Sequence, residues 1–186
     1  MLIDSNAKNG YNSVAFALTE YIVNQNQTPI ILCVGCDRVV GDSLAPMVGE
    51  LLKNKYMLPT YVYGDLELNI TAQNIMSYIK KVKEWHKGAP IIVVDATLGD
   101  SEQVGCVHYY KGGCYPAGIY TQGVGKIGDY CILGVVGEKG TNQAKFLHGI
   151  NLKIVKKLSE EIAKAIWCAF RYSDAIVDKV RQDLVV

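Results

Sequence analysis

Two aspartates, Asp42 and Asp95, occupy the positions in this sequence that are best suited to acid–base chemistry. Asp95 directly follows the apolar run 91–94, and Asp42 lies in a short polar segment after another apolar run, 30–34. A carboxylate next to a buried strand is partly removed from water, so it needs a partner or a raised pKa. Two such carboxylates that share one site cannot both ionise freely, and this separates them into an acid and a base. The pair is therefore a candidate for proton-transfer catalysis.

Strands and helices must position these aspartates, and the hydrophobic pattern predicts that the two kinds of element alternate. Apolar runs predict strands, whereas apolar residues at spacings of three and four predict helices. The predicted strands cover residues 30–34, 61–64, 91–94, 104–110 (at an edge of the sheet) and 130–136. The predicted helices cover residues 13–24, 44–52, 71–87 and 155–166, with a short one over 174–183. This alternation predicts a single layered α/β domain over residues 1–186 with a mainly parallel sheet.

The predicted sheet suggests where the two aspartates lie. In open α/β sheets, ligands bind beyond the carboxyl ends of the strands, near the point where the strand order reverses. If the first three strands are ordered 2-1-3, segments 35–43 and 95–100 meet at such a crevice. Asp42 and Asp95 would then face each other with their carboxylates within about 7 Å, close enough for direct or one-water coupling. The alternative for Asp42 is a helix N-cap, because it precedes a segment with helical apolar spacing.

The glycine-containing segment 35–43 does not have the pattern of a phosphate-binding loop. Five residues separate Gly35 from Gly41, whereas a P-loop has four, and Asp42 stands where that loop has its lysine. A carboxylate at this point would repel a phosphate group. The dinucleotide-binding pattern G-x-G-x-x-G is also absent from this turn. We therefore expect no nucleotide and no other cofactor.

The cysteines and histidines do not predict a metal or redox site. Cys33 and Cys36 form a CxxC, but Cys33 lies inside a predicted strand, and a reactive thiolate is favoured at a helix N-terminus instead. A zinc site of this type needs a second ligand pair, and the sequence has no other CxxC and no HxxxH. The histidines adjoin no candidate nucleophile; they are His86, His108 and His148. We expect Cys33 to be buried and without a ligand, and we expect no metal site.

Charge and hydropathy exclude several classes of partner. The chain has 19 Lys and Arg against 18 Asp and Glu, for a net charge of +1, and no block of five like charges. Neither a nucleic acid nor an anionic membrane surface is therefore expected as a partner. No 18 apolar residues follow one another, so no membrane span is expected. The first ten residues do not have the pattern of a signal peptide, and the six cysteines then suggest reduced thiols in the cytoplasm.

Several segments resemble the signature of the YyaC-type sporulation proteins of endospore-forming Firmicutes. The most specific are 31–38 (ILCVGCDR), 41–49 (GDSLAPMVG) and 94–99 (VDATLG). The likeness covers roughly residues 28–166, leaving 171–186 as a C-terminal extension, and includes three further segments, 63–67, 116–118 and 127–130. That family is in turn similar to the spore germination protease, an atypical aspartic peptidase, and more distantly to hydrogenase maturation proteases. The resemblance implies a three-layer α/β/α sandwich of the phosphorylase/hydrolase-like type.

The resemblance also implies roles for individual residues. The essential aspartates of the germination protease lie in an Asp-Ala-Leu-Gly-Pro segment and in an Asp-Ala segment after a strand, which match Asp42 and Asp95 here. The pair would hydrolyse a peptide bond, and Asp37, Arg38 and Glu67 would tune the site. Hydrogenase maturation proteases place a histidine metal ligand beyond the second acid. This chain has a glycine-rich segment there, 112–128, that contains no histidine, which argues against nickel sensing.

Two functions follow from the resemblance, and the sequence leaves both open. The first is a sporulation-associated, peptidase-like protein in the cytoplasm of the forespore or in the spore core. The second is a non-catalytic spore protein that binds a peptide or protein partner in the same crevice. Both imply a peptide or protein ligand, no nucleic acid, no membrane and no cofactor, and both leave a homo-oligomer open.

Overall fold

The computed structural model describes residues 2–4, 10–116, 125–140 and 150–183. Its strands are β1 (Leu2–Asp4), β2 (Ile30–Cys33), β3 (Val62–Tyr63), β4 (Ile91–Gly99), β5 (Cys106–Lys111) and β6 (Tyr130–Glu138). Its α-helices are α1 (Gly10–Val23), α2 (Leu44–Glu50), α3 (Ile75–Trp85) and α5 (Leu152–Asp183). Three short helical segments complete the described elements: η1 (Gly41–Ser43), η2 (Leu51–Lys55) and η3 (Ser101–Gln103).

The described strands form one mixed, mainly parallel sheet in the order β1-β5-β6-β4-β2-β3. Strands β3, β2, β4 and β6 are parallel, whereas β5 is antiparallel to β6 and β1 is antiparallel to β5. The three neighbours β3-β2-β4 correspond to the second, first and third predicted strands. Both the α/β fold and the expected 2-1-3 order are therefore confirmed.

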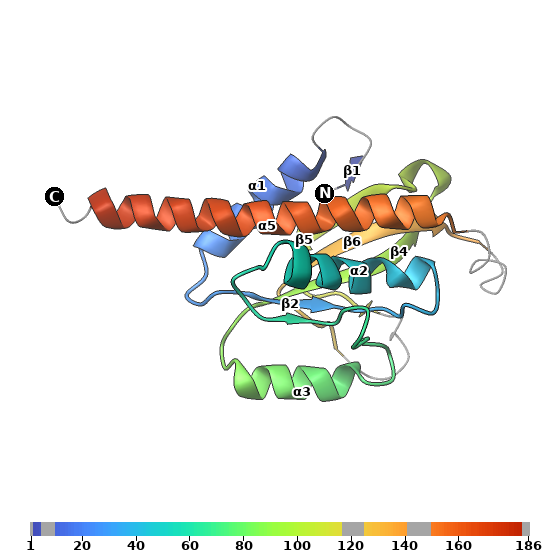
Figure 1. Cartoon of the computed structure of the whole chain (residues 1–186), viewed down its shortest axis with the longest axis horizontal. Helices are drawn as coiled ribbons and strands as arrows, with labels where there is room; N and C mark the ends of the chain where they lie inside the picture. The colour runs from blue at the N-terminus through green and yellow to red at the C-terminus, as the bar shows by residue number, and fades with distance from the viewer. Residues whose placement is uncertain (1, 5–9, 117–124, 141–149, 184–186) are drawn as a thin grey trace.

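Helices cover both faces of this sheet (Figure 1). Helices α1, α2 and α5 lie on one face, and α3 lies on the other. Strand β2 is buried on both faces. Ile31 and Cys33 pack into the hydrophobic core under α1, α2 and α5, whereas Ile30 and Leu32 pack into the core under α3. Side chains alternate along a strand, so a strand covered on both faces needs an apolar residue at every position.

Strand β4 is longer than its apolar run predicts. Residues 95–99 lie beyond the predicted strand 91–94, but they continue the parallel ladder with β6, where Asp95 pairs with Leu133 and Thr97 with Val135. The apolar pattern stops at Val94, yet the ladder goes on because β6 runs beside this segment. As a consequence Asp95 lies within the sheet, with only 5% of its surface exposed.

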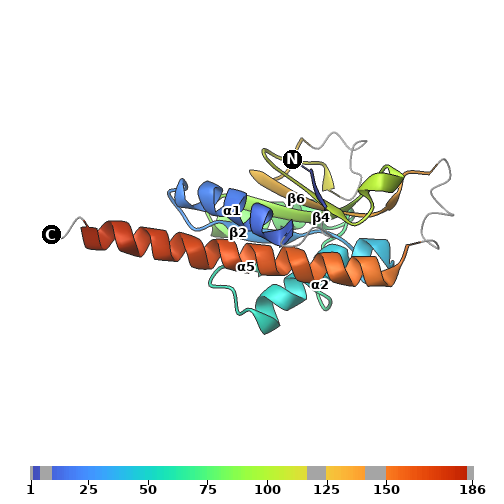
Figure 2. The same ribbon diagram turned by 90° about the horizontal axis from the view of Figure 1, so that it is seen from above.

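The edge of the sheet and the C-terminal helix also differ from expectation. Strand β5 is not at the edge, because β1 pairs with it on the outer side; three residues are too few to show an alternating pattern. Helix α5 is one continuous helix, where two were predicted, since its 32 residues contain neither Gly nor Pro. Figure 2 shows α5 running past the other elements at its C-terminal end, as in Figure 1.

Helix α2 begins at Leu44, as predicted, whereas the N-cap alternative for Asp42 and the predicted start of α3 are wrong. Asp42 is not the N-cap of α2, because it lies inside η1 and Ser43 occupies the N-cap position. Helix α3 begins at Ile75 and not at Thr71, whose carbonyl oxygen instead accepts hydrogen bonds from the N–H groups of Asn74 and Ile75. Within the described ranges, no helix is both long enough and apolar enough to cross a membrane.

Candidate functional site

A cavity of about 1280 Å³ opens where β2 and β4 lead into their following segments. Asp42 from η1 and Asp95 from β4 both line it, and η1 contacts β4. Asp37 and Arg38, from the loop after β2, and Glu67, from the loop after β3, line the same cavity. The structure thus brings the five predicted site residues to one cavity, although they come from three separate parts of the chain.

Asp42 is half-buried between two buried neighbours, Gly41 and Ser43. The N–H of Cys36 donates a hydrogen bond to the carbonyl oxygen of Asp42 over 3.1 Å, and the same N–H stabilises the ionised carboxylate. Burial raises the pKa of Asp42 above its ordinary value, and the hydrogen bond from Cys36 opposes part of that rise. A carboxyl group with a raised pKa keeps its proton over a wider range of pH.

Asp95 is more deeply buried than Asp42. Its Oδ1 accepts a hydrogen bond from the N–H of Ala96 over 2.8 Å. The thiols of Cys114 and Cys131 lie close to Asp95. A hydrogen bond with Cys131 and burial raise the pKa of Cys114, and the negative charge of Asp95 adds to the rise. Burial, its place within β4 and these neighbours give Asp95 a different environment from that of Asp42.

The other predicted site residues stand at the exposed rim of the cavity. The side chains of Asp37, Arg38 and Glu67 are all exposed. Arg38 and Lys139 bring positive charge to a cavity that otherwise carries four carboxyl groups, those of Asp37, Asp42, Glu67 and Asp95. The cavity is therefore acidic on balance.

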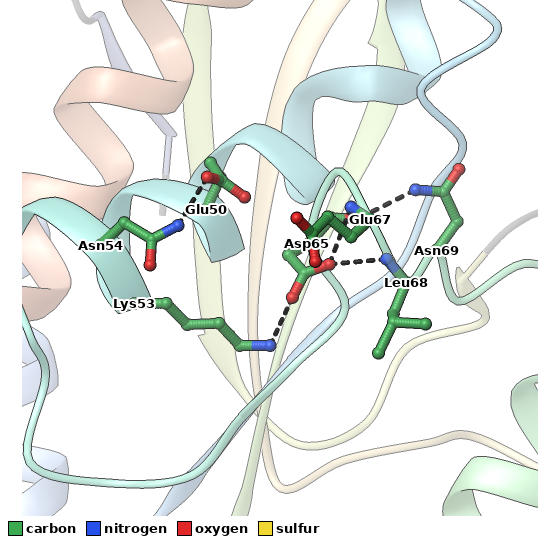
Figure 3. A network of polar contacts seen from close by, with 7 residues as sticks. All are labelled: Glu50, Lys53, Asn54, Asp65, Glu67, Leu68 and Asn69. Atoms are coloured by element: carbon green, nitrogen blue, oxygen red, sulfur yellow. Dashed lines mark hydrogen bonds and ion pairs between the residues drawn. The ribbon is translucent and has the colours of Figure 1, made fainter.

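The loop that carries Glu67 is organised by a buried aspartate, Asp65 (Figure 3). Its Oδ1 accepts hydrogen bonds from the N–H groups of Glu67 (2.9 Å) and Leu68 (2.6 Å). Its Oδ2 accepts a hydrogen bond from Nζ of Lys53 over 2.5 Å. Burial tends to raise the pKa of Asp65, but Lys53 and the two N–H groups outweigh burial and lower the pKa.

Some residues of the cavity were missed by the sequence reasoning. Asn69, Tyr110, Cys114, Tyr115 and Lys139 line it beside the predicted residues. The pair Gly64-Asp65 followed by Asn69 has the composition of a turn, and this signal could have pointed to the loop. The residues from β5 and beyond β6 had no such local signal, because sheet pairing brings them to the cavity.

The metal and thiol predictions can be placed on the structure. Cys33 is fully buried, as predicted, and burial raises the pKa of its thiol, whereas Cys36 is half-buried on the cavity wall. Within the ranges that the structure covers, no group of three or more His, Cys, Asp or Glu side chains could hold a metal ion. His86 caps the end of α3, and its Nε2 lies 2.6 Å from the Tyr63 hydroxyl. His108 lies in β5, and His148 lies outside the described residues.

Comparisons with known proteins match the part of the chain that forms the cavity. The family described as "Protein of unknown function (DUF1256)" matches residues 2–165, a range that contains every residue lining the cavity. "Uncharacterized protein YyaC" of Bacillus subtilis (strain 168) is 31% identical over 137 residues, which cover 74% of this chain and 67% of the relative. The chain therefore belongs to the DUF1256 family.

Proposed function

We propose that this protein is a sporulation-associated, aspartic-type peptidase in which Asp42 and Asp95 hydrolyse a peptide bond. One observation carries the proposal: two carboxyl groups from different elements, both withdrawn from water, line the same cavity. Carboxyl groups that share a site titrate as a coupled pair, so one holds a proton while the other is ionised. This is the starting state for acid–base hydrolysis.

The reaction needs only these two groups and a water molecule. The ionised carboxylate takes a proton from water while the water oxygen forms a bond to the peptide carbonyl carbon. The protonated carboxyl gives its proton to the peptide nitrogen as the C–N bond breaks. The pair ends with one proton, as it began, with the two roles exchanged. Burial raises the pKa of Asp42, and Asp95 is buried as well, so either carboxyl can hold the shared proton at the start.

The cavity suits a segment of polypeptide. Its volume of about 1280 Å³ exceeds the range of roughly 300–1,000 Å³ that is typical of small-molecule sites. Its rim carries charged groups, Asp37, Arg38 and Glu67, which tune the titration of the two aspartates and contact the substrate. A buried acid pair with a charged, open rim fits a peptide better than a small apolar ligand.

The proposal extends to the type of fold and to the place of action. Helices on both faces of a mainly parallel sheet support a three-layer α/β/α sandwich of the phosphorylase/hydrolase-like type, shared with the germination protease. The sequence resemblance to YyaC-type sporulation proteins supports action in the cytoplasm of the forespore or in the spore core. Both points rest on that resemblance.

Cleavage in heavy-oxygen water tests the peptidase proposal. The purified protein is incubated with forespore extract in H₂¹⁸O, and new peptide termini are identified by mass spectrometry. We expect new carboxyl termini that carry ¹⁸O, and we expect Asp42→Asn and Asp95→Asn each to lower their yield by about 100-fold or more. Asp174→Asn is the matched control, because Asp174 is exposed on α5 and does not line the cavity.

Two results would overturn the peptidase proposal. Equal cleavage by the wild type and both cavity variants would assign the activity to a contaminant. No cleavage, together with peptide binding that is weakened by Asp42→Asn or Asp95→Asn, would show a non-catalytic binding protein that uses the same cavity.

A further inference from the structure

Asn69 links the loop after β3 to the loop that holds Asp42. Its Oδ1 accepts a hydrogen bond from the N–H of Asp37 over 3.0 Å, and its Nδ2 donates to the carbonyl oxygen of Asp65 over 2.8 Å. The residue before Asp37 is Cys36, whose N–H donates to Asp42. Two consecutive N–H groups of the 36–37 segment are thus bonded, one to Asn69 and one to Asp42.

We propose that Asn69 is a positioning residue of the candidate site, which holds the 36–37 segment in place so that the Cys36 N–H is aimed at Asp42. This role deepens the proposed function. The effect of Asn69 on catalysis rests on that function, because it acts through Asp42. Asn69 does not act on substrate; it acts on Asp42 through the backbone.

The chemistry of the Asn69 side chain supports this role. An amide offers one acceptor and one donor on the same rigid plane, and both are used here on opposite sides, toward Asp37 and toward Asp65. An aspartate at this position would keep an acceptor for Asp37 but would lose the donor to Asp65. An alanine would lose both bonds. The position is therefore specific for the amide.

The loop that carries Asn69 is held in place at its N-terminal end by Asp65. Asp65 is 7% exposed, and Lys53 of η2 and the N–H groups of Glu67 and Leu68 satisfy its carboxylate (Figure 3). The carbonyl oxygen of Asn69 also accepts a hydrogen bond from Nδ2 of Asn74 over 3.0 Å. Asn69 is thus fixed from both sides before it contacts Asp37, and this rigidity is what a positioning residue requires.

The test compares Asn69→Ala with wild type by two measurements that need no substrate. Native-state hydrogen exchange is measured at the amides of Cys36 and Asp37, and we expect it to be roughly three- to tenfold faster in Asn69→Ala. Carboxyl NMR follows the titration of Asp42, and we expect its pKa to rise, because the hydrogen bond from Cys36 that lowers it is weakened. The other carboxyl groups of the cavity, those of Asp37, Glu67 and Asp95, are followed in the same spectra, and the positive charges that face them are Arg38 and Lys139.

Asn54→Ala is the matched control, since Asn54 donates from Nδ2 to Glu50 over 2.6 Å but has no contact with the 36–37 segment (Figure 3). It should leave both measurements unchanged. Asn69→Asp, which retains the acceptor for Asp37, should have an intermediate effect on hydrogen exchange, and it provides the test if Asn69→Ala does not fold. Only exchange is compared in this variant, because its added negative charge would itself raise the pKa of Asp42.

Unchanged exchange and an unchanged Asp42 titration in Asn69→Ala would overturn the positioning role, even if the variant were less stable. Changed exchange and titration in a protein that cleaves no peptide would support the positioning role and would count against the peptidase proposal alone.

Discussion

A Cβ atom added to Gly35 would lie 2.1 Å from the carbonyl oxygen of Asp42. The backbone of the loop after β2 therefore lies directly against the candidate catalytic aspartate. The same Cβ would lie 2.9 Å from Cδ of Pro46 in α2. Neither the Asp42 backbone nor the Pro46 ring can easily move away from it. Only glycine allows this approach, and the contact joins strand β2, η1 and α2 at one point.

We expect Gly35→Ala to destabilise the protein by about 2–3 kcal/mol, because the new methyl group meets rigid backbone. Denaturant unfolding measures the loss. Gly125→Ala is the control: no atom of the described residues lies within 4 Å of its added Cβ, so the change should stay within about 0.5 kcal/mol. Equal effects of the two substitutions would contradict the close approach of Gly35 to Asp42.

Stability should depend on pH through Asp42. Burial raises its folded-state pKa above the ordinary value of 3.8, so the folded protein binds this proton more tightly than the unfolded chain does. The stability that the protonated group contributes is complete below the unfolded pKa and is lost as the pH rises through the folded pKa. Asp42→Asn stays uncharged, and above the folded pKa it should be more stable than wild type.

The measurement for Asp42 is the free energy of unfolding of both proteins across the acidic and neutral range. The advantage of Asp42→Asn should shrink as the pH falls toward 3.8. A difference between the two proteins that does not change with pH would show that the Asp42 carboxyl is not withdrawn from water.

Asp65 should show the opposite dependence on pH. Although burial opposes ionisation, Lys53 and the N–H groups of Leu68 and Glu67 lower its pKa, so the charged form stabilises the fold. This stability is present above the unfolded pKa and is lost as the pH falls through the folded pKa. At neutral pH we expect Asp65→Asn to cost about 2 kcal/mol, since it weakens hydrogen bonds to a charged group.

Urea unfolding of Asp65→Asn at neutral pH and at pH values below the ordinary carboxyl pKa checks this expectation. Glu161→Gln is the control, because Glu161 lies 3.8 Å from Lys157 in a more exposed pair on one face of α5. Its effect should be below about 0.5 kcal/mol. A cost for Asp65→Asn that persists unchanged at low pH would mean that its charge does not stabilise the fold.

The C-terminal part of α5 should be dispensable for the fold. Residues 174–179 are exposed, including Ile176 at 46% and Val177 at 37%, whereas Ser173 is buried. A chain that ends at Ser173 should therefore lose less than about 1 kcal/mol of stability, because little apolar surface is uncovered. Unfolding experiments together with light scattering at several concentrations measure the effect. If the truncation converts a dimer into monomers, this part of α5 is an interface between copies of the chain.

The sequence by itself determined the class of the fold and pointed to five of the residues that line the cavity. Strands buried on both faces must be apolar at every position and helices on one face must be apolar at every third or fourth, and both patterns are local. The order β3-β2-β4 was one possible arrangement of these strands, and the structure shows that it is the one formed. General rules for parallel sheets also pointed to Asp37, Arg38, Asp42 and Asp95 as neighbours, since all follow β2 or the apolar part of β4.

Only the tertiary structure decided how far each element extends and what surrounds the aspartates. Asp95 lies inside β4 because β6 pairs with it, and β5 is covered at the edge by β1. Strand β6 was visible in the apolar pattern, but its pairing with residues 95–99 was not, and β1 is too short to show a pattern. The link from Lys53 through Asp65 and Asn69 to Asp37 joins segments that are 12 and 32 residues apart in the chain. A hydrogen bond between side chains and backbone depends on a few tenths of an ångström, and apolar periodicity does not carry that information.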